Sequence, residues 1–360
     1  MYIFLRMFLS AGLPKIPFVG IPFIIFFMIK DVMLLSKFLR NRVVSYYYFV
    51  VLIVFILYFI RSMFSESSVA DWSFIAALLF KFVCGPFLGY YLAVAYEKGL
   101  AVHFLLTHLI ILVLAIISPQ IYQLLLYFQS AGARDVFADL NDMRAISFGL
   151  LHNEGAMFVA VNFYFLVRHK YKIFRSFSLS SFLFMSMSRL TGLLLFVIIF
   201  FKNYRALALL CFFCILTFVF LGFSESLPEI LAQAFEPVIY LFRYGTFDIP
   251  TIVHMSDMLV LPLHLSTWIY GDGLFFEESG LFYMFTDLGF LRLIYFAGLS
   301  GFLLFIIMNV FPVFWGLKRS SANYIFFVLF LIANIKGLNP HPWMFFLLYF
   351  CNSKEFRRLL

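Results

Sequence analysis

The sequence is a series of long apolar runs, separated by short segments that carry nearly all of the charge. A helix of about 20 apolar residues crosses the hydrocarbon core of a bilayer, which is about 30 Å thick. The runs predict an all-α polytopic integral membrane protein with about 11 spans, in a range of about 10–12. The predicted spans are 16–35, 44–61, 73–96, 101–118, 155–168, 176–188, 190–202, 206–223, 287–316, 322–337 and 342–352. The shortest of them can be halves of broken helices.

Composition supports this interpretation. Apolar residues make up 64% of the chain and charged residues 12%, which leaves too few polar groups to cover a water-soluble surface. The spans use most of the length, so residues 1–360 are expected to form a single transmembrane domain. Cys211 and Cys214 have CxxC spacing but lie inside an apolar run, where packing is the expected role. The net charge of +8 comes from scattered clusters and not from one basic stripe, which argues against a nucleic-acid partner.

The positive-inside rule orients the spans. If the spans alternate, five basic clusters fall on one side, which we assign to the cytoplasm: Lys37/Arg40/Arg42, Arg168/Lys170/Lys172/Arg175, Lys202/Arg205, Lys318/Arg319 and Lys354/Arg357/Arg358. The opposite side receives two larger acidic loops near 119–154 and 224–286. Long loops without a domain of their own are often functional, so these two are expected to carry the chemistry.

Two arginines stand out in the first half of the chain. Arg144 precedes a predicted span, with ten residues between it and Gly155, a residue type that tolerates unusual backbone angles. Its planar guanidinium suits a phosphate group, although pairing with Asp139 or Asp142 is an equal alternative. Arg189 lies between two short apolar runs, where an arginine at membrane depth implies a functional or paired role. Alternatively, its segment is a loop and its side chain reaches lipid head groups.

The second outer loop ends in a further candidate segment. Asp287 and Arg292 lie at the outer mouth of a predicted span, and Glu277 and Glu278 precede it. The alternative is an ordinary interface with an internal Asp–Arg pair. His152, His254 and His264 from the loops are candidate general bases, although the preferred interpretation of each is a hydrogen-bonded loop residue. Arg243 lies in a predicted interfacial helix.

The sequence contains no HExxH, no P-loop and no Gly-rich dinucleotide turn. Neither a metal nor another cofactor is expected.

These segments resemble the Wzy-type O-antigen and polysaccharide repeat-unit polymerases, which are related to the O-antigen ligases. Arg144 to Gly155 is similar to the family's Arg-x10-Gly motif, SMSRLTGLLLF to its Ser-Arg-small-Gly segment, and TDLGFLRLIYFAGLSG to its segment after the large loop. The chain departs from the pattern at Arg243, which has no glycine at the spacing of a second Arg-x10-Gly. Asp287 stands where ligases tend to carry a histidine, which favours a polymerase.

The resemblance implies a GT-C-like architecture and a multi-pass protein of the bacterial inner membrane, with its active site facing the periplasm. It would act as a glycosyltransferase on an undecaprenyl-diphosphate-linked oligosaccharide, without metal or nucleotide sugar. Membrane lipid and a chain-length-regulating membrane protein are the other expected partners.

Within that resemblance, Arg144, Arg189 and Arg292 are expected to neutralise the diphosphate. Asp287 is the first choice for the base, ahead of Glu277, Glu278, His152 and His254. Substrate binding is expected from Arg292, Arg243, His152, His254, Glu277, Glu278 and Gly155. Loop aromatics are candidates to stack on sugars or to anchor in the interface: Trp268, Tyr270, Phe275, Phe276 and Tyr283.

Three other functions remain as alternatives. A ligase of the same superfamily shares the architecture and the lipid-diphosphate donor. A lipid-linked oligosaccharide flippase would need charges along a path across several spans, whereas mid-membrane charge is sparse here. A non-catalytic scaffold would not need arginines on the outer face.

Overall fold

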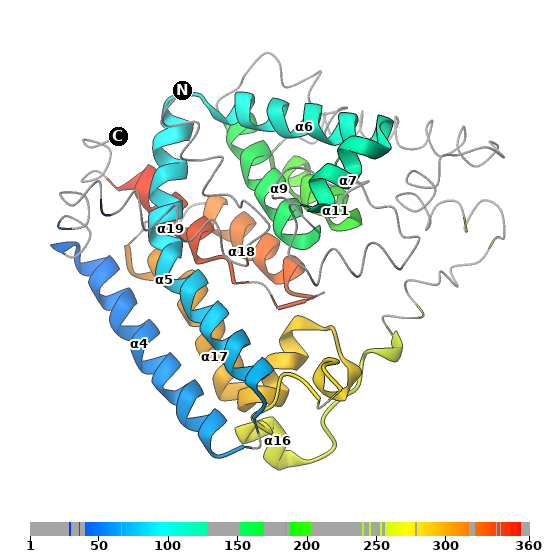
Figure 1. Ribbon diagram of the computed structural model, residues 1–360. Coiled ribbons are helices and arrows are strands. Elements are labelled where there is room, and N and C mark those ends of the chain that lie inside the picture. The colour runs from blue at the N-terminus through cyan, green and yellow to red at the C-terminus, as the bar shows by residue number, and fades with distance from the viewer. Residues whose placement is uncertain are drawn as a thin grey trace. The chain divides into compact units, whose positions relative to one another are not determined.

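The computed structural model (Figure 1) describes residues 40–65, 67–127, 152–168, 188–202, 256–277, 279–316, 321–335 and 340–353, with positions 29, 36, 184, 240, 245, 253 and 337–338. Within these ranges the regular elements are helices, and the β-type pairing is a single bridge between Phe276 and Phe282. The described part of the chain is therefore all-helical, which confirms the all-α part of the prediction.

The chain divides into two compact units. The first contains α4 (Arg42–Met63), α5 (Val69–Glu97), α16 (Leu265–Tyr270), the 3₁₀ turn η2 (Tyr283–Phe285), α17 (Gly289–Gly316), α18 (Ser321–Ala333) and α19 (Pro342–Asn352). The second contains α6 (Ala101–Ile117), α7 (Pro119–Tyr127), α9 (His152–Arg168) and α11 (Arg189–Lys202).

The apolar runs predict these helices closely. Each predicted span that falls in the described ranges overlaps a helix of similar length: α4, α5, α6, α9, α11, α17, α18 and α19. The segments 16–35, 176–188 and 206–223 lie outside the described residues, apart from isolated positions.

The start of the predicted loop 119–154 is helical instead. Pro119 has no N–H to continue α6 but fits the first position of a new helix, so the chain bends by 118° into α7.

Three helices in the described ranges are long and apolar enough to cross a membrane: Arg42–Met63, Val69–Glu97 and Gly289–Val313. The bent pair α6 and α7 would make a fourth if it counts as one span. Together with the composition, these helices indicate a membrane-embedded protein. The total of about 11 spans stays a prediction.

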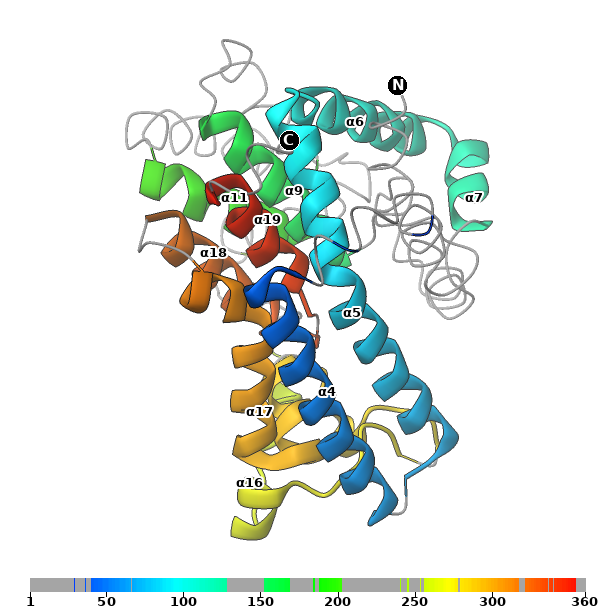
Figure 2. The same cartoon turned by 90° about the vertical axis from the view of Figure 1, so that its left-hand side faces the viewer.

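One face of α4 is packed and the opposite face is apolar and exposed. Phe49, Leu52 and Ile56 lie on the exposed face, which would be costly in water but suits contact with lipid tails. On the packed face, the Tyr47 hydroxyl donates to the Phe82 carbonyl of α5 at 2.9 Å, and the Tyr58 hydroxyl donates to the Gly301 carbonyl of α17 at the same distance. Figures 1 and 2 both show α4, α5 and α17 side by side.

The 28 residues of α17 do not form one straight helix. Ala297 and Gly298 leave the helical conformation, and Gly298 has a φ of +65°, which glycine adopts without strain. The rings of Phe290 and Phe302 lie 5.1 Å apart, whereas twelve residues of straight helix would separate them by about 18 Å. The chain therefore folds back at this break.

The break corrects the prediction of one continuous span over 287–316. After it, the segment from Leu299 to Gly316 covers about 27 Å, close to the thickness of the hydrocarbon core. The short helical arm before it, from Gly289 to Phe296, carries Arg292.

The core of the first unit is the contact between α5 and α19. Every residue from Pro342 to Cys351 is buried, so α19 is surrounded on all sides. Its backbone comes so close to α5 that a Cβ added at Gly89 would lie 2.6 Å from the Trp343 carbonyl oxygen and 2.8 Å from the Leu347 nitrogen. Small residues allow this close approach of two membrane helices.

Replacing Gly89 with Ala should therefore force α5 and α19 apart, at a cost of about 1–3 kcal/mol of unfolding free energy, typical of overpacking. Unfolding of the purified protein in mixed micelles measures the change. Ser73→Ala, on the exposed face of α5, is the matched control. Equal stability of Gly89→Ala and wild type would contradict the close α5–α19 contact.

Candidate functional site

The described part of the segment 224–286 folds over the N-terminal end of α5 and is held there by Asp71. This carboxylate is fully buried and accepts four hydrogen bonds. The Ser68 backbone N–H and hydroxyl donate to it at 2.8 Å each, and the backbone N–H groups of Phe275 and Phe276 donate at 2.7 and 3.1 Å. One buried charge thus caps a helix and holds a loop that is about 200 residues away in sequence.

The end of α4 holds the same loop from another side. The Arg61 guanidinium donates through Nη2 to the Gly271 carbonyl. The hydroxyls of Ser65 and Ser67 lie 3.1 and 3.2 Å from the Gly273 carbonyl oxygen, and the Gly273 N–H donates to the Phe296 carbonyl at 3.0 Å. The loop is therefore a fixed structure that joins α4, α5 and the first arm of α17.

Arg292 is the buried charge under this loop. Its side chain is 5% exposed, and its guanidinium lies over the ring of Phe282 at 3.7 Å and near those of Phe74 and Phe276 at 5.0 and 5.8 Å. The rings supply cation–π attraction, which compensates part of the lost hydration. Its Nε and Nη2 atoms are buried and make no hydrogen bond to the described residues.

Asp287 is the counter-ion of Arg292, at the loose distance of 3.9 Å between Oδ1 and Nη1. Its side chain is 26% exposed, so it faces both the buried guanidinium and solvent. The Gly337 N–H donates to the Asp287 carbonyl at 2.7 Å, which fixes the backbone here. Among the described residues, this buried guanidinium has unused donors and one loose counter-ion, so it is suited to receive an anionic group.

Glu277 supports the turn between these elements. Its carboxylate accepts from the Met284 N–H at 3.1 Å. Met284 and Phe285 are the described non-glycine residues with positive φ, at 53° and 55°. Such strained backbone concentrates near functional sites and needs support from its surroundings.

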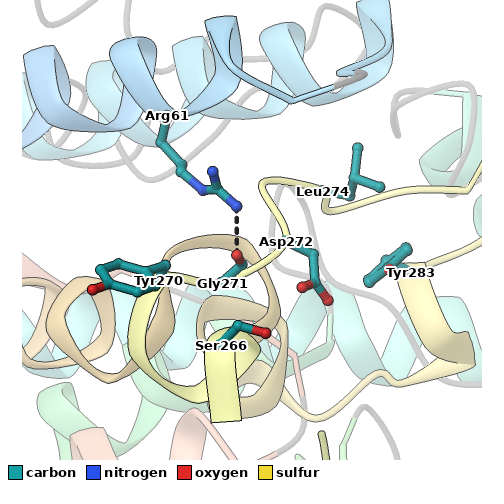
Figure 3. Close-up of a pocket in the computed structure, with 7 residues that line it drawn as sticks. All are labelled: Arg61, Ser266, Tyr270, Gly271, Asp272, Leu274 and Tyr283. Atoms are coloured by element: carbon teal, nitrogen blue, oxygen red, sulfur yellow. Dashed lines mark hydrogen bonds between the residues drawn. The ribbon is translucent and has the colours of Figure 1, made fainter. Parts of the chain in front are cut away.

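We call the rings of Phe74, Phe276 and Phe282 around Arg292 the Arg292 cage. A pocket of about 600 Å³ opens beside this cage, in the same unit. Figure 3 shows Arg61 reaching from α4 towards the Gly271 carbonyl, with Tyr270 and Tyr283 on opposite sides of Gly271. Asp272 also lines the pocket and accepts from the Thr267 hydroxyl at 2.7 Å. Partial burial raises the pKa of the Tyr283 hydroxyl, and the charges of Asp272 and Glu277 raise it further, so the hydroxyl remains a neutral donor at physiological pH.

The structure brings together only some of the residues predicted from sequence. Asp287, Arg292 and Glu277 lie on one loop and the arm that follows it. His152 and Arg189 are the first residues of α9 and α11, and their side chains are outside the described set. Arg144, Arg243, His254 and Glu278 lie outside the described residues.

Gly155 corrects a detail of the sequence interpretation. It is buried inside α9 with helical structure, so it does not take an unusual backbone angle.

Sequence reasoning missed Asp71, Arg61 and Asp272. For Asp71 a signal exists, because Ser68-x-x-Asp71 has the spacing of a capping box. For Arg61 the signal is weaker: a single charge that ends an apolar run. The described residues contain no group of three or more His, Cys, Asp or Glu side chains arranged to hold a metal ion.

No family model, curated protein or solved structure matches the chain.

Replacing Asp71 with Asn should loosen the loop. The amide puts an N–H group where the carboxylate accepts, and the loss of hydrogen bonds to a charged group costs about 1.5–3 kcal/mol each. Limited proteolysis should cut the 271–288 segment faster than in wild type. Asp257→Asn, an exposed carboxylate of the same loop, is the control. Equal protease resistance of Asp71→Asn and wild type would rule out this anchoring role.

Proposed function

We propose that this chain is a surface-polysaccharide polymerase of the O-antigen type. It would join undecaprenyl-diphosphate-linked oligosaccharide repeat units by glycosyl transfer at the periplasmic face of the bacterial inner membrane. About 11 spans in a GT-C-like arrangement belong to this proposal, as does a chain-length-regulating partner. The motifs around Arg144, Arg189 and Asp287 support it from sequence.

The observation that carries the proposal is the state of Arg292. Burying a guanidinium is unfavourable unless its donors are used, and Nε and Nη2 make no hydrogen bond within the described part of the chain. A planar guanidinium binds two oxygens of a phosphate group at once. A diphosphate that enters beside Asp287 would satisfy these donors and replace the loose 3.9 Å contact as the main counter-charge.

The proposed reaction is a glycosyl transfer. A hydroxyl oxygen of one repeat unit attacks the anomeric carbon of the glycan on another, and a carbon–oxygen bond forms. The bond from that carbon to the diphosphate oxygen breaks, and its electron pair leaves with the undecaprenyl diphosphate. Arg292 stabilises the charge that develops on the leaving group.

Asp287 accepts the proton of the attacking hydroxyl. Its side chain is 26% exposed, which allows it to meet the substrate. The leaving group is already activated, so the reaction consumes no nucleotide sugar.

Replacing Arg292 with Lys tests the proposal. The charge remains but the fork that binds two oxygens is lost, and removal of such a stabilising group typically lowers the rate about 10²–10³-fold. The assay is complementation of a strain that lacks the chain, with its surface glycan run on a gel. The wild-type chain should restore a ladder, and Arg292→Lys should leave single repeats.

Arg40→Lys is the matched control, because Arg40 is an exposed arginine that lies two residues before α4. It should restore the full ladder. A full ladder from Arg292→Lys, at equal protein level in the membrane, would contradict the role of Arg292. Loss of all attached glycan in the deletion strain, with long lipid-linked polymer accumulating, would identify a ligase instead.

A further inference from the structure

We infer that the pocket lined by Arg61, Tyr270, Asp272 and Tyr283 binds neutral sugar rings of the oligosaccharide substrate. This inference rests on the proposed function and gives it a second subsite, separate from the diphosphate position at Arg292. Neither Arg61 nor Asp272 stands out as a site residue from the sequence alone.

The chemistry of the lining fits a polyhydroxyl ligand. Seven residues line the pocket: Arg61, Ser266, Tyr270, Gly271, Asp272, Leu274 and Tyr283. They combine hydroxyls, a carboxylate and a guanidinium, so the pocket offers both donors and acceptors. A sugar ring, with hydroxyls that donate and accept around its edge, uses both kinds of group. A second phosphate would meet the negative charge of Asp272.

The pocket also has the size and the flat surfaces that sugars need. Its volume of about 600 Å³ lies within the usual range for small-molecule sites, about 300–1,000 Å³. The aromatic rings of Tyr270 and Tyr283 can cover the apolar face of a sugar while their hydroxyls bind its edge. Tyr270 is 67% exposed, so its ring is available to a ligand.

The other loop aromatics have structural roles. The Trp268 Nε1 donates to the Pro262 carbonyl at 2.8 Å, and its ring packs against the cluster of Leu291, Ile294 and Tyr295. Phe275 stacks on Phe296 with ring centroids 4.1 Å apart, and Phe276 belongs to the Arg292 cage. Of the five aromatics expected to face sugars, only Tyr270 and Tyr283 line the pocket.

The pocket walls are fixed before any ligand arrives. The Thr267 hydroxyl holds the Asp272 carboxylate, the Asp272 N–H donates to the Tyr295 carbonyl, and Arg61 holds the Gly271 carbonyl. Pre-organised polar groups lose little entropy on binding, and they reject a ligand that lacks the matching hydroxyl. The pocket is therefore suited to select among sugars.

Consecutive residues of one turn contribute to the subsite and to the diphosphate position. Phe282 lies under the guanidinium of Arg292, and the next residue, Tyr283, lines the pocket. A lipid-linked sugar can thus place its diphosphate near Arg292 and a ring beside Tyr283. The strained residues Met284 and Phe285 follow directly and fix the direction of this turn.

The test is direct binding of sugar without lipid or diphosphate. The probe is the repeat-unit oligosaccharide hydrolysed from the surface polysaccharide of cells that carry the gene. Saturation-transfer NMR titrations with the full-length protein in nanodiscs give its Kd. Tyr270→Ala and Asp272→Asn should each weaken binding at least about tenfold, a loss of about 1.4 kcal/mol.

Two controls match these variants in chemistry. Tyr324→Ala removes a tyrosine of α18 that is 61% exposed, and Asp257→Asn removes an exposed carboxylate of the same loop. Both should bind the oligosaccharide as the wild type does. Because Tyr270 is largely exposed, its loss should not unfold the protein.

The outcomes separate this inference from the proposed function. Unchanged Kd values in both pocket variants would overturn the sugar site, as would a wild-type protein that polymerises the lipid-linked substrate but does not bind the free oligosaccharide. Pocket-dependent binding by a protein that makes no polymer would support the sugar site and overturn the polymerase proposal.

Discussion

The candidate site depends on one buried carboxylate. Asp71 sits at the first turn of α5 with no exposure to solvent, and four hydrogen bonds compensate for its desolvation. Two of them come from Ser68 in its own capping box and two from the backbone of Phe275 and Phe276. These two phenylalanines begin the turn that covers Arg292 and leads to Tyr283. The carboxylate that caps α5 therefore also fixes the shape of the site.

The membrane explains why charge is concentrated in this way. In the described ranges, α4 exposes phenylalanine, leucine and isoleucine on one face, which lipid tails solvate as well as protein would. Charged groups gain nothing there, and most of the described ones lie near helix ends or in the loops between helices. Arg292 differs from these groups, because it is buried among three aromatic rings with one loose counter-ion among the described residues. A cation kept at such cost is a functional candidate by default.

The sequence predicts the helices well and the site only in part. Apolar runs define α4, α5 and α19 to within a few residues, because the bilayer requires a long apolar stretch with internal hydrogen bonds. They do not reveal the break at Gly298, since a glycine in an apolar run looks the same whether the helix continues or folds back.

The proximity of Asp287 to Arg292 is local and could be anticipated. The contacts of Asp71 with Phe275 and of Arg61 with Gly271 join segments about 200 residues apart, and no local pattern encodes them. The roles of Arg144, Arg189 and the other loop residues stay predictions.

The central claim is that the unused donors of Arg292 receive a diphosphate. Titration of the purified protein in nanodiscs with undecaprenyl diphosphate, the leaving group alone, measures this most directly. The account predicts that Arg292→Lys weakens the Kd about tenfold or more, because hydrogen bonds to a charged group are worth about 1.5–3 kcal/mol, while Arg40→Lys leaves it unchanged. Equal affinity of the wild type and Arg292→Lys for undecaprenyl diphosphate would contradict it.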